Sequence, residues 1–359
     1  MDYQSLIPTA DTIPAPSWIF VVLGQLLFLL HIILVNAVLG GALIILFKRI
    51  IGKDDENITN WQLPVAKKFP VMVALGINMG IPPLLFLQVI YGHLFYSSSV
   101  LMAVYWIIII PLLILAYYGT YIHIGKFAKS PVFSKVSLLI AVIFILYIGF
   151  MLVNNNTLME QPEKWTAYFE NRGGTILNLS NPAFFPRYLH FLAASVAIGG
   201  LLYAGIYYFR KDEPEKKEEK IKGALQIFAI ATAVQIVIGF WFLLSIPQDF
   251  IPQFMGQNLV ATLFLMVGIL AGIGALVTGF LGKFKPTIIQ LVITLVAMIV
   301  TRFNLRVMYL SDNFQLSELK LSPQYGILIL FLVVLLIGLG AIAYMLKAGF
   351  NKNERRAVS

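Results

Sequence analysis

Residues 187–200 read RYLHFLAASVAIGG, so an arginine and a histidine stand at the start of a long apolar run. His190 comes three residues after Arg187, which is close to one turn of a helix. A polar group inside a membrane costs several kcal/mol unless it finds a partner, so an intramembrane histidine is a functional candidate. The rest of the chain decides whether this run crosses a membrane.

The composition is that of a polytopic membrane protein. Of 359 residues, 59% are hydrophobic and 12% are charged, and the mean hydropathy of +0.84 lies outside the range of soluble domains. The chain has no cysteine, which excludes disulfides, thiolate-bound zinc, iron–sulfur clusters and covalently attached haem c within it. A redox cofactor would therefore be held by histidine or methionine. We expect no nucleic acid among the partners.

Nine apolar runs are long enough to cross about 30 Å of hydrocarbon. They lie at roughly 17–47, 69–96, 101–125, 136–154, 186–209, 223–246, 258–282, 286–310 and 324–346. The predicted fold is all-α: one integral membrane domain over residues 1–359. It would comprise an external tail at 1–16, a nine-helix bundle at 17–346 and a cytoplasmic tail at 347–359.

The basic residues predict the orientation of the bundle. Loops after the odd-numbered spans, together with the C-terminal tail, hold 20 Lys and Arg, against 6 on the opposite side with its helix ends included. Cytoplasmic loops are enriched in these residues, so we expect the N-terminus outside and the C-terminus in the cytoplasm, in the inner membrane of a prokaryotic cell. The longest external segments, 155–185 and 310–323, are then the expected docking surfaces for an external partner.

All four histidines fall inside the predicted spans or at their ends: His31, His93, His123 and His190. At about 1.5 Å per residue, three of them lie in the outer half, where haem ligands that exchange electrons with an external partner would lie. The fourth, His123, lies at the cytoplasmic end of its span, where a position at the water interface explains this histidine better than a role as a haem ligand. For any one of them, a neighbouring helix or interfacial water is an alternative partner. The small residues after His190 indicate either tight helix packing or space for a porphyrin.

Several stretches resemble helices of the large, haem-bearing subunit of cytochrome bd quinol oxidases. They are RYLHFLAASVAIGGLLYAGIYYF (187–209), LLHIILVNAVLGGALIILFKRIIGK (29–53), and ALGINMG (74–80) with IYGHLFY (90–96). The resemblance covers most of the chain at low identity. It implies that His190 is an axial ligand of a low-spin haem b and that His31 binds a second haem.

The same resemblance extends to LFLMVGILAGIGALVTGF (263–280), which is similar to the helix whose methionine completes the low-spin haem. It implies that Met266 is the partner of His190. A methionine in an apolar helix is ordinarily a packing residue, so other methionines are alternatives. They are Met79, Met255, Met298 and Met308.

The chain departs from that family where the oxidases carry carboxylates. No acid occurs in LMAVYWIIIIPLLILAYYGTYIH (101–123) or in RFNLRVMYL (302–310), and the external loop IPQDFIPQFMGQN (246–258) lacks the family's Lys and Glu pair. Oxygen reduction needs protons at a dry site, so these losses argue against a terminal oxidase. The additional His93 is a candidate second ligand, with His31, of a bis-histidine haem.

The sequence therefore predicts a membrane cytochrome b subunit of a respiratory complex. It would exchange electrons between the quinone pool and an external redox partner, such as a multihaem c-type cytochrome, beside other membrane subunits. Arg187 is a candidate for binding a haem propionate or for anchoring at the interface, and Arg302 and Arg306 invite the same interpretation. Gln248 and Asp249 are quinone-site candidates, although a solvated loop also explains them.

Two other classes of function stay open. One is a terminal quinol oxidase that works without those acids. The other is a haem-free transporter or scaffold, in which the histidines serve packing or proton relay.

Overall fold

Nine helices are long and apolar enough to cross a membrane within residues 3–51, 56–210 and 214–358, the parts that the computed structural model describes. The predictions of nine spans and of an all-α membrane bundle are confirmed. The membrane helices are α1 (Ser17–Ile51), α3 (Phe69–Leu101), α4 (Ala103–Lys126), α5 (Pro131–Glu160), α6 (Phe184–Tyr208), α7 (Pro214–Ser245), α8 (Leu259–Phe280), α9 (Phe284–Leu310) and α10 (Tyr325–Val358).

Shorter elements join these helices. They are α2 (Glu56–Ala66), the 3₁₀ turns η1 (Tyr3–Leu6), η2 (Pro162–Phe169), η3 (Gln248–Phe250) and η5 (Leu316–Glu318), and the π-helical turn η4 (Gln253–Gln257). Two of these results differ from the prediction. The helix α2 was not expected, and α5 continues to Glu160, six residues past the predicted end of its span at residue 154.

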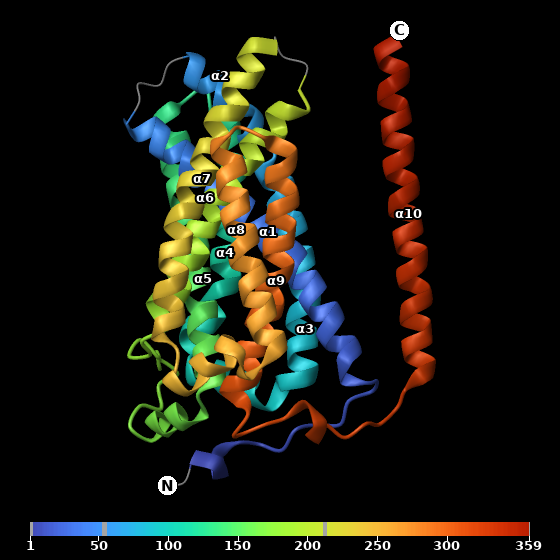
Figure 1. Cartoon of the computed structure of the whole chain (residues 1–359). Coiled ribbons are helices and arrows are strands. Elements are labelled where there is room, and N and C mark those ends of the chain that lie inside the picture. Colours follow the sequence, from blue (N-terminus) through green and yellow to red (C-terminus); the bar gives the residue numbers. More distant parts are fainter. Residues whose placement is uncertain (1–2, 52–55, 211–213, 359) are drawn as a thin grey trace.

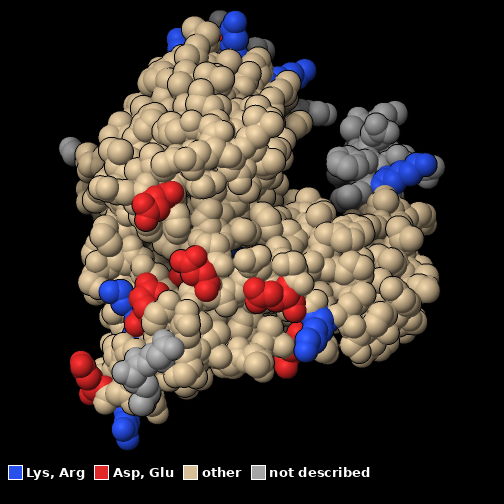
Figure 2. Space-filling view, turned by 60° about the horizontal axis from the view of Figure 1, so that its bottom comes forward, with Lys and Arg blue, Asp and Glu red and all other residues tan. Residues whose placement is uncertain are grey.

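The bundle has two chemically different ends. Its N-terminal end, at the bottom of Figure 1, is where α1 and α6 begin and where α5 and α9 finish. There the N-terminal tail is fastened to the segment before α10, because Ile13 forms a parallel bridge with Leu321. Figure 2 shows acidic side chains spread over this end. Its exposed acids are Asp11, Glu163, Glu170, Asp249, Asp312 and Glu318, and its exposed bases are Lys164, Arg172 and Lys320.

The parallel pair α1 and α6 forms the centre of the bundle. A Cβ atom on Gly40 would overlap the backbone of Ser195, and one on Gly199 would overlap Gly40. Ser195 also donates a hydrogen bond from Oγ to Oδ1 of Asn36 over 2.8 Å. Glycines let helix backbones approach closely, so the small residues after His190 serve tight packing here.

The last membrane helix, α10, runs beside the bundle without packing against it (Figure 1). Its apolar side chains are exposed along its membrane-spanning part, as at Ile329 (60%), Leu336 (68%) and Tyr344 (73%). A helix that is apolar all round suits a lipid environment or a neighbouring membrane helix.

Replacing Gly199 with alanine tests the central helix pair. The added methyl group would meet the Gly40 backbone, and overpacking of this kind costs about 1–3 kcal/mol. We expect Gly199→Ala to lower the free energy of unfolding, measured by denaturant titration in mixed micelles. The matched control is Gly223→Ala on α7, where no atom lies within 4 Å of the new Cβ. Equal losses in both variants would contradict the packing account.

Candidate functional site

His31 is held in one orientation by the neighbouring helix α3. Its Nδ1 lies 2.7 Å from the carbonyl oxygen of Gly76, and its ring faces Gly80, where a Cβ would come within 2.6 Å of the ring. A carbonyl oxygen only accepts hydrogen bonds, so Nδ1 carries the proton and Nε2 carries the lone pair. No described residue hydrogen-bonds to Nε2, which is therefore free to bind a metal ion.

His190 faces the opposite side, toward α7. The side-chain amide nitrogen of Gln235 lies 3.3 Å from its Nε2, and a Cβ on Gly239 would come within 3.2 Å of its ring. The amide donates to Nε2, so this ring also carries its proton on Nδ1, which is buried without a partner among the described residues. Buried polar atoms normally have partners, so an orphaned nitrogen marks an environment that the polypeptide alone does not complete.

The two histidines lie at the same depth. Their helices run in the same direction and touch where Ser195 bonds Asn36. His31 precedes Asn36 by five residues and His190 precedes Ser195 by five, so each lies about 7.5 Å closer to the N-terminal end than this contact. One ring faces α3 and the other faces α7, which makes two separate sites at one level.

His93 lies far from His31. It comes thirteen residues after Gly80 on α3, about 20 Å along the helix, and its ring packs edge-on against Phe314 at 4.8 Å. Two ligands of one iron must lie within a few ångströms of each other. The structure does not bring this pair together, so a haem shared by His31 and His93 is not supported.

His123 is fully buried at the C-terminal end instead of lying at an interface with water. Its Nδ1 lies 3.0 Å from the carbonyl oxygen of Ser134. Arg49 donates to Oγ of the same serine over 3.3 Å and to the carbonyl oxygen of Phe127 over 3.4 Å. This group fastens α1, α4 and α5 together, which is a structural role.

Met266 lies on α8 with half of its surface exposed. The contacts of the His190 ring come from α7, which packs against both α6 and α8. Among the alternatives, Met298 on α9 lies against α8, where a Cβ on Gly268 would overlap it. Nothing in these contacts tests a pairing of either methionine with His190, so the pairing with Met266 stays a prediction.

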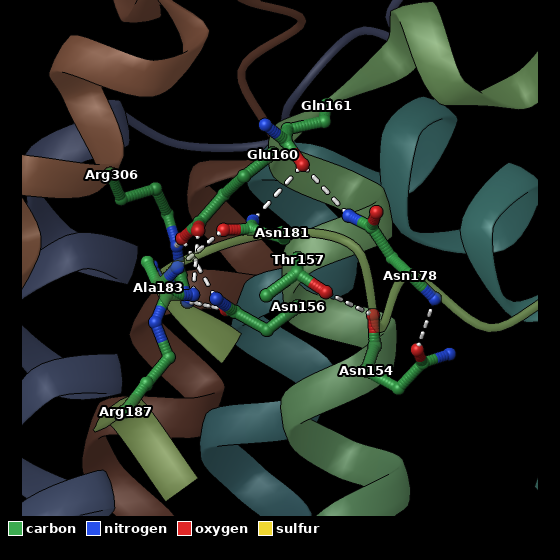
Figure 3. Close-up of polar contacts among 10 residues, drawn as sticks. All are labelled: Asn154, Asn156, Thr157, Glu160, Gln161, Asn178, Asn181, Ala183, Arg187 and Arg306. Atoms are coloured by element: carbon green, nitrogen blue, oxygen red, sulfur yellow. Dashed lines mark hydrogen bonds and ion pairs between the residues drawn. The ribbon is translucent and has the colours of Figure 1, made fainter. Parts of the chain in front are cut away.

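A buried ion-pair network closes the N-terminal end of the bundle (Figure 3). Glu160, at the end of α5 and 5% exposed, accepts a hydrogen bond from Nη1 of Arg187 over 2.7 Å and lies 3.7 Å from Nε of Arg306. Asn156 completes the group, since its amide donates to Glu160 over 2.8 Å and its oxygen accepts from Arg306 over 2.6 Å. One carboxylate therefore joins α5, α6 and α9.

Arg302, one turn before Arg306 on α9, has no such partner. Its guanidinium carbon lies 4.3 Å from the centre of the Phe28 ring, and that ring lies 6.4 Å from the His31 ring. No hydrogen bond or ion pair from a described residue reaches Arg302. The region therefore holds three guanidinium groups against one carboxylate, and the unpaired one is separated from His31 by a single aromatic ring.

The segment between α5 and α6, predicted as a docking surface, is fastened by amide side chains (Figure 3). Oε1 of Gln161 accepts from Asn178 over 2.7 Å and from Asn181 over 3.0 Å. Oδ1 of Asn154 accepts from the backbone of Asn178 over 2.7 Å, and Oδ1 of Asn181 accepts from the backbone of Ala183 over 2.8 Å. The ion-pair network thus sits beneath an ordered cover.

Gln248 and Asp249, the quinone-site candidates, are exposed in η3 at the N-terminal end. The next residue, Phe250, packs edge-on against Tyr309 at 5.0 Å. The Tyr309 ring in turn lies 5.8 Å from the guanidinium carbon of Arg187. Two rings and a cation therefore separate this loop from the His190 site.

The sequence alone does not identify two residues of this site, Glu160 and Gln235. The predicted span ends at residue 154, within the three asparagines at 154–156, and this places Glu160 in the external segment 155–185. The apolar Leu158 and Met159 that follow were the available signal that the helix continues. Gln235 gave no signal, because one glutamine in an apolar helix does not reveal which neighbour it faces.

Comparison with protein-family models and with curated proteins finds no match for this chain.

Replacing Glu160 with glutamine should destabilise the bundle strongly. The substitution leaves Arg187 and Arg306 without their carboxylate, and breaking a buried ion pair from one side costs about 3–5 kcal/mol. The free energy of unfolding in mixed micelles measures the loss. Glu163→Gln, an exposed acid three residues further on, is the control and should change stability by less than about 0.5 kcal/mol. Similar free energies of unfolding for the two variants would show that Glu160 does not hold α5, α6 and α9 together.

Proposed function

We propose that the chain is a membrane cytochrome b: a subunit that binds haem through His31 and His190 and carries electrons between the quinone pool and a partner outside the membrane. The observation that carries the proposal is the His31 ring, oriented by the Gly76 carbonyl with its Nε2 free. Axial histidines of metal sites characteristically donate their other N–H to a carbonyl or carboxylate, which fixes the ring and strengthens the ligand.

The charges around His31 also suit a haem. Three buried or partly buried guanidinium groups, those of Arg187, Arg302 and Arg306, are opposed by the single carboxylate of Glu160. Buried charge is costly unless it is paired, so this region favours a ligand that brings negative charge. The two propionates of a haem supply it, and Arg302 is the residue placed to bind one of them.

His190 would bind a second haem on the other side of the α1–α6 pair. Its Nε2 accepts from Gln235, so Gln235 must turn away for this nitrogen to bind iron. Met266 on α8 is the residue that would hold the same iron together with His190. A bound haem supplies one-electron transfer between ferrous and ferric iron. The residues of this chain hold its iron, neutralise its carboxylates and exclude water.

The surfaces of the bundle suggest its partners. If the N-terminus lies outside, the acidic N-terminal end faces an external redox protein with a basic surface, such as a multihaem c-type cytochrome. Gln248 and Asp249 at that end would contact the quinone head group. The exposed helix α10 would pack against another membrane subunit of the same complex. The lysine-rich C-terminal end would face the cytoplasm, which suits the inner membrane of a prokaryotic cell.

A terminal quinol oxidase is the second candidate, and one observation favours it. With His93 about 20 Å away along α3, His31 would be the only histidine to hold its haem, and such a haem would be able to bind oxygen. Against it, no acid occurs in α4, and the buried Glu160 is engaged by two arginines. A route for protons to such a haem is therefore not evident in the described residues.

The haem content of histidine variants tests the proposal. Protein purified from a haem-producing host should show a Soret band and a reduced α band. His31→Ala and His190→Ala should each remove one haem, measured as the pyridine haemochrome per chain. The control is His93→Ala, which should leave the haem content unchanged because this ring packs against Phe314. A well-folded protein without a Soret band would establish the scaffold or transporter alternative.

Carbon monoxide separates electron transfer from oxygen reduction. A haem held by two protein ligands binds CO poorly, so the electron-transfer proposal requires a second ligand beside His31 and predicts that CO barely changes the spectrum of the reduced protein. A quinol analogue should reduce the haem while little oxygen is consumed. A large CO difference spectrum that disappears in His31→Ala, together with quinol-driven oxygen uptake, would instead establish the terminal oxidase.

A further inference from the structure

Asn78 lies on the outer face of α3, in the middle of an apolar span. It comes ten residues after Lys68, which precedes the helix at the C-terminal end of the bundle, so it lies about 15 Å along α3 from that end. This is the middle of a hydrocarbon layer about 30 Å thick. The side chain of Asn78 is exposed, on a helix whose other faces contact α1, α4 and α5.

The helix itself satisfies only part of the Asn78 amide. Its Nδ2 donates to the carbonyl oxygen of Ala74 over 2.8 Å. An amide has two N–H donors and an acceptor oxygen, so one donor and Oδ1 remain. No described residue outside this turn of α3 hydrogen-bonds to Asn78. Hydrocarbon offers no water in place of a partner, and an unpartnered polar group there is costly, so lipid tails alone do not suit this position.

The exposed residues around Asn78 form a stripe with the spacing of a helix–helix contact. The stripe consists of Val71, Leu75, Asn78 and Leu85, which follow one another at steps of four, three and seven residues. Positions that recur every 3.5 residues stay on one side of a helix that crosses its partner with a left-handed twist. One asparagine in such an otherwise apolar stripe specifies the register of a helix pair.

Membrane topology decides which partner supplies the missing polar group. Copies of one chain are inserted in the same orientation, so the twofold axis of a dimer stands normal to the membrane. Two α3 helices on this axis run parallel, and each residue of the contact faces its own copy at the same depth. An amide both donates and accepts, so Asn78 of each copy completes the other. A helix of a different protein would need a polar side chain at this same depth.

We propose that the chain forms a parallel homodimer in the membrane through the outer face of α3. The two Asn78 side chains hydrogen-bond to each other at its centre, and Val71, Leu75 and Leu85 pack beside them. Neither haem nor the ligand histidines take part in this contact, so the proposal does not depend on the proposed function.

Cysteine cross-linking of the full-length chain tests the contact. The chain has no cysteine, so one introduced cysteine reports on its own position alone. Asn78→Cys, oxidised with copper phenanthroline in liposomes, should give a disulfide-linked dimer, because the parallel twofold contact brings residue 78 of both copies together. The control is Leu270→Cys on α8, which is 63% exposed and lies about 15 Å from the end of its helix at Phe280.

The control variant should stay monomeric under the same oxidation. Equal cross-linking of the two variants would mean random collision in the membrane and would overturn the proposal. Absence of a cross-linked dimer in Asn78→Cys would overturn it as well.

A second measurement follows the strength of the dimer without cross-linking. Copies that carry donor and acceptor fluorophores are reconstituted together, and energy transfer is recorded as the lipid-to-protein ratio rises. Asn78→Leu has a similar shape and removes the hydrogen bonds, so it should weaken the dimer about threefold to thirtyfold, the range for polar pairs between membrane helices.

The matched control is Asn304→Leu on α9, where the amide likewise donates to a carbonyl oxygen one turn back, that of Val300, over 2.9 Å. This variant should leave the dimer unchanged. Equal weakening by the two substitutions, or none by Asn78→Leu, would overturn the role of Asn78. A monomer at every protein density would leave this face to lipid or to a different subunit, and would overturn the homodimer.

Discussion

Guanidinium groups buried among membrane helices must find negative charge, and this requirement organises the N-terminal end of the bundle. Among the described residues Glu160 is the only buried acid, and it supplies that charge to Arg187 and Arg306 at the point where α5, α6 and α9 meet. The loop that covers this end is held at the same place, because Gln161, the residue after Glu160, accepts hydrogen bonds from two asparagines of the loop that leads into α6.

The same requirement connects the ion pairs to the histidine sites. Glu160 supplies one negative charge against three guanidinium groups, so two positive charges remain, and Arg302 carries one of them where only Phe28 separates it from His31. His190 lies one turn from Arg187, at the depth of His31 but facing another helix. The nitrogens of the two proposed ligands and the unpaired Arg302 thus occur in the same layer of the bundle, which is the arrangement that a haem with its iron and two carboxylates would use.

Much of the fold could be predicted from the sequence, because hydropathy over about 20 residues is a strong signal for a membrane helix. Contacts between helices could not. Depth along a helix was estimated from where each span begins, and α3 is 33 residues long, so two histidines assigned to the same half of the membrane came out far apart. The small residues after His190 suited either packing or a porphyrin, and only the backbone contact between Gly40 and Gly199 decides for packing.

The proposed role of His31 as a haem ligand is tested most directly by an experimental density map of the protein purified from a haem-producing host. We predict planar density bonded to Nε2 of His31, with the Nδ1 contact to Gly76 retained and a carboxylate beside Arg302. A map in which only protein or lipid surrounds Nε2, in a chain that is otherwise folded as described, would contradict the account.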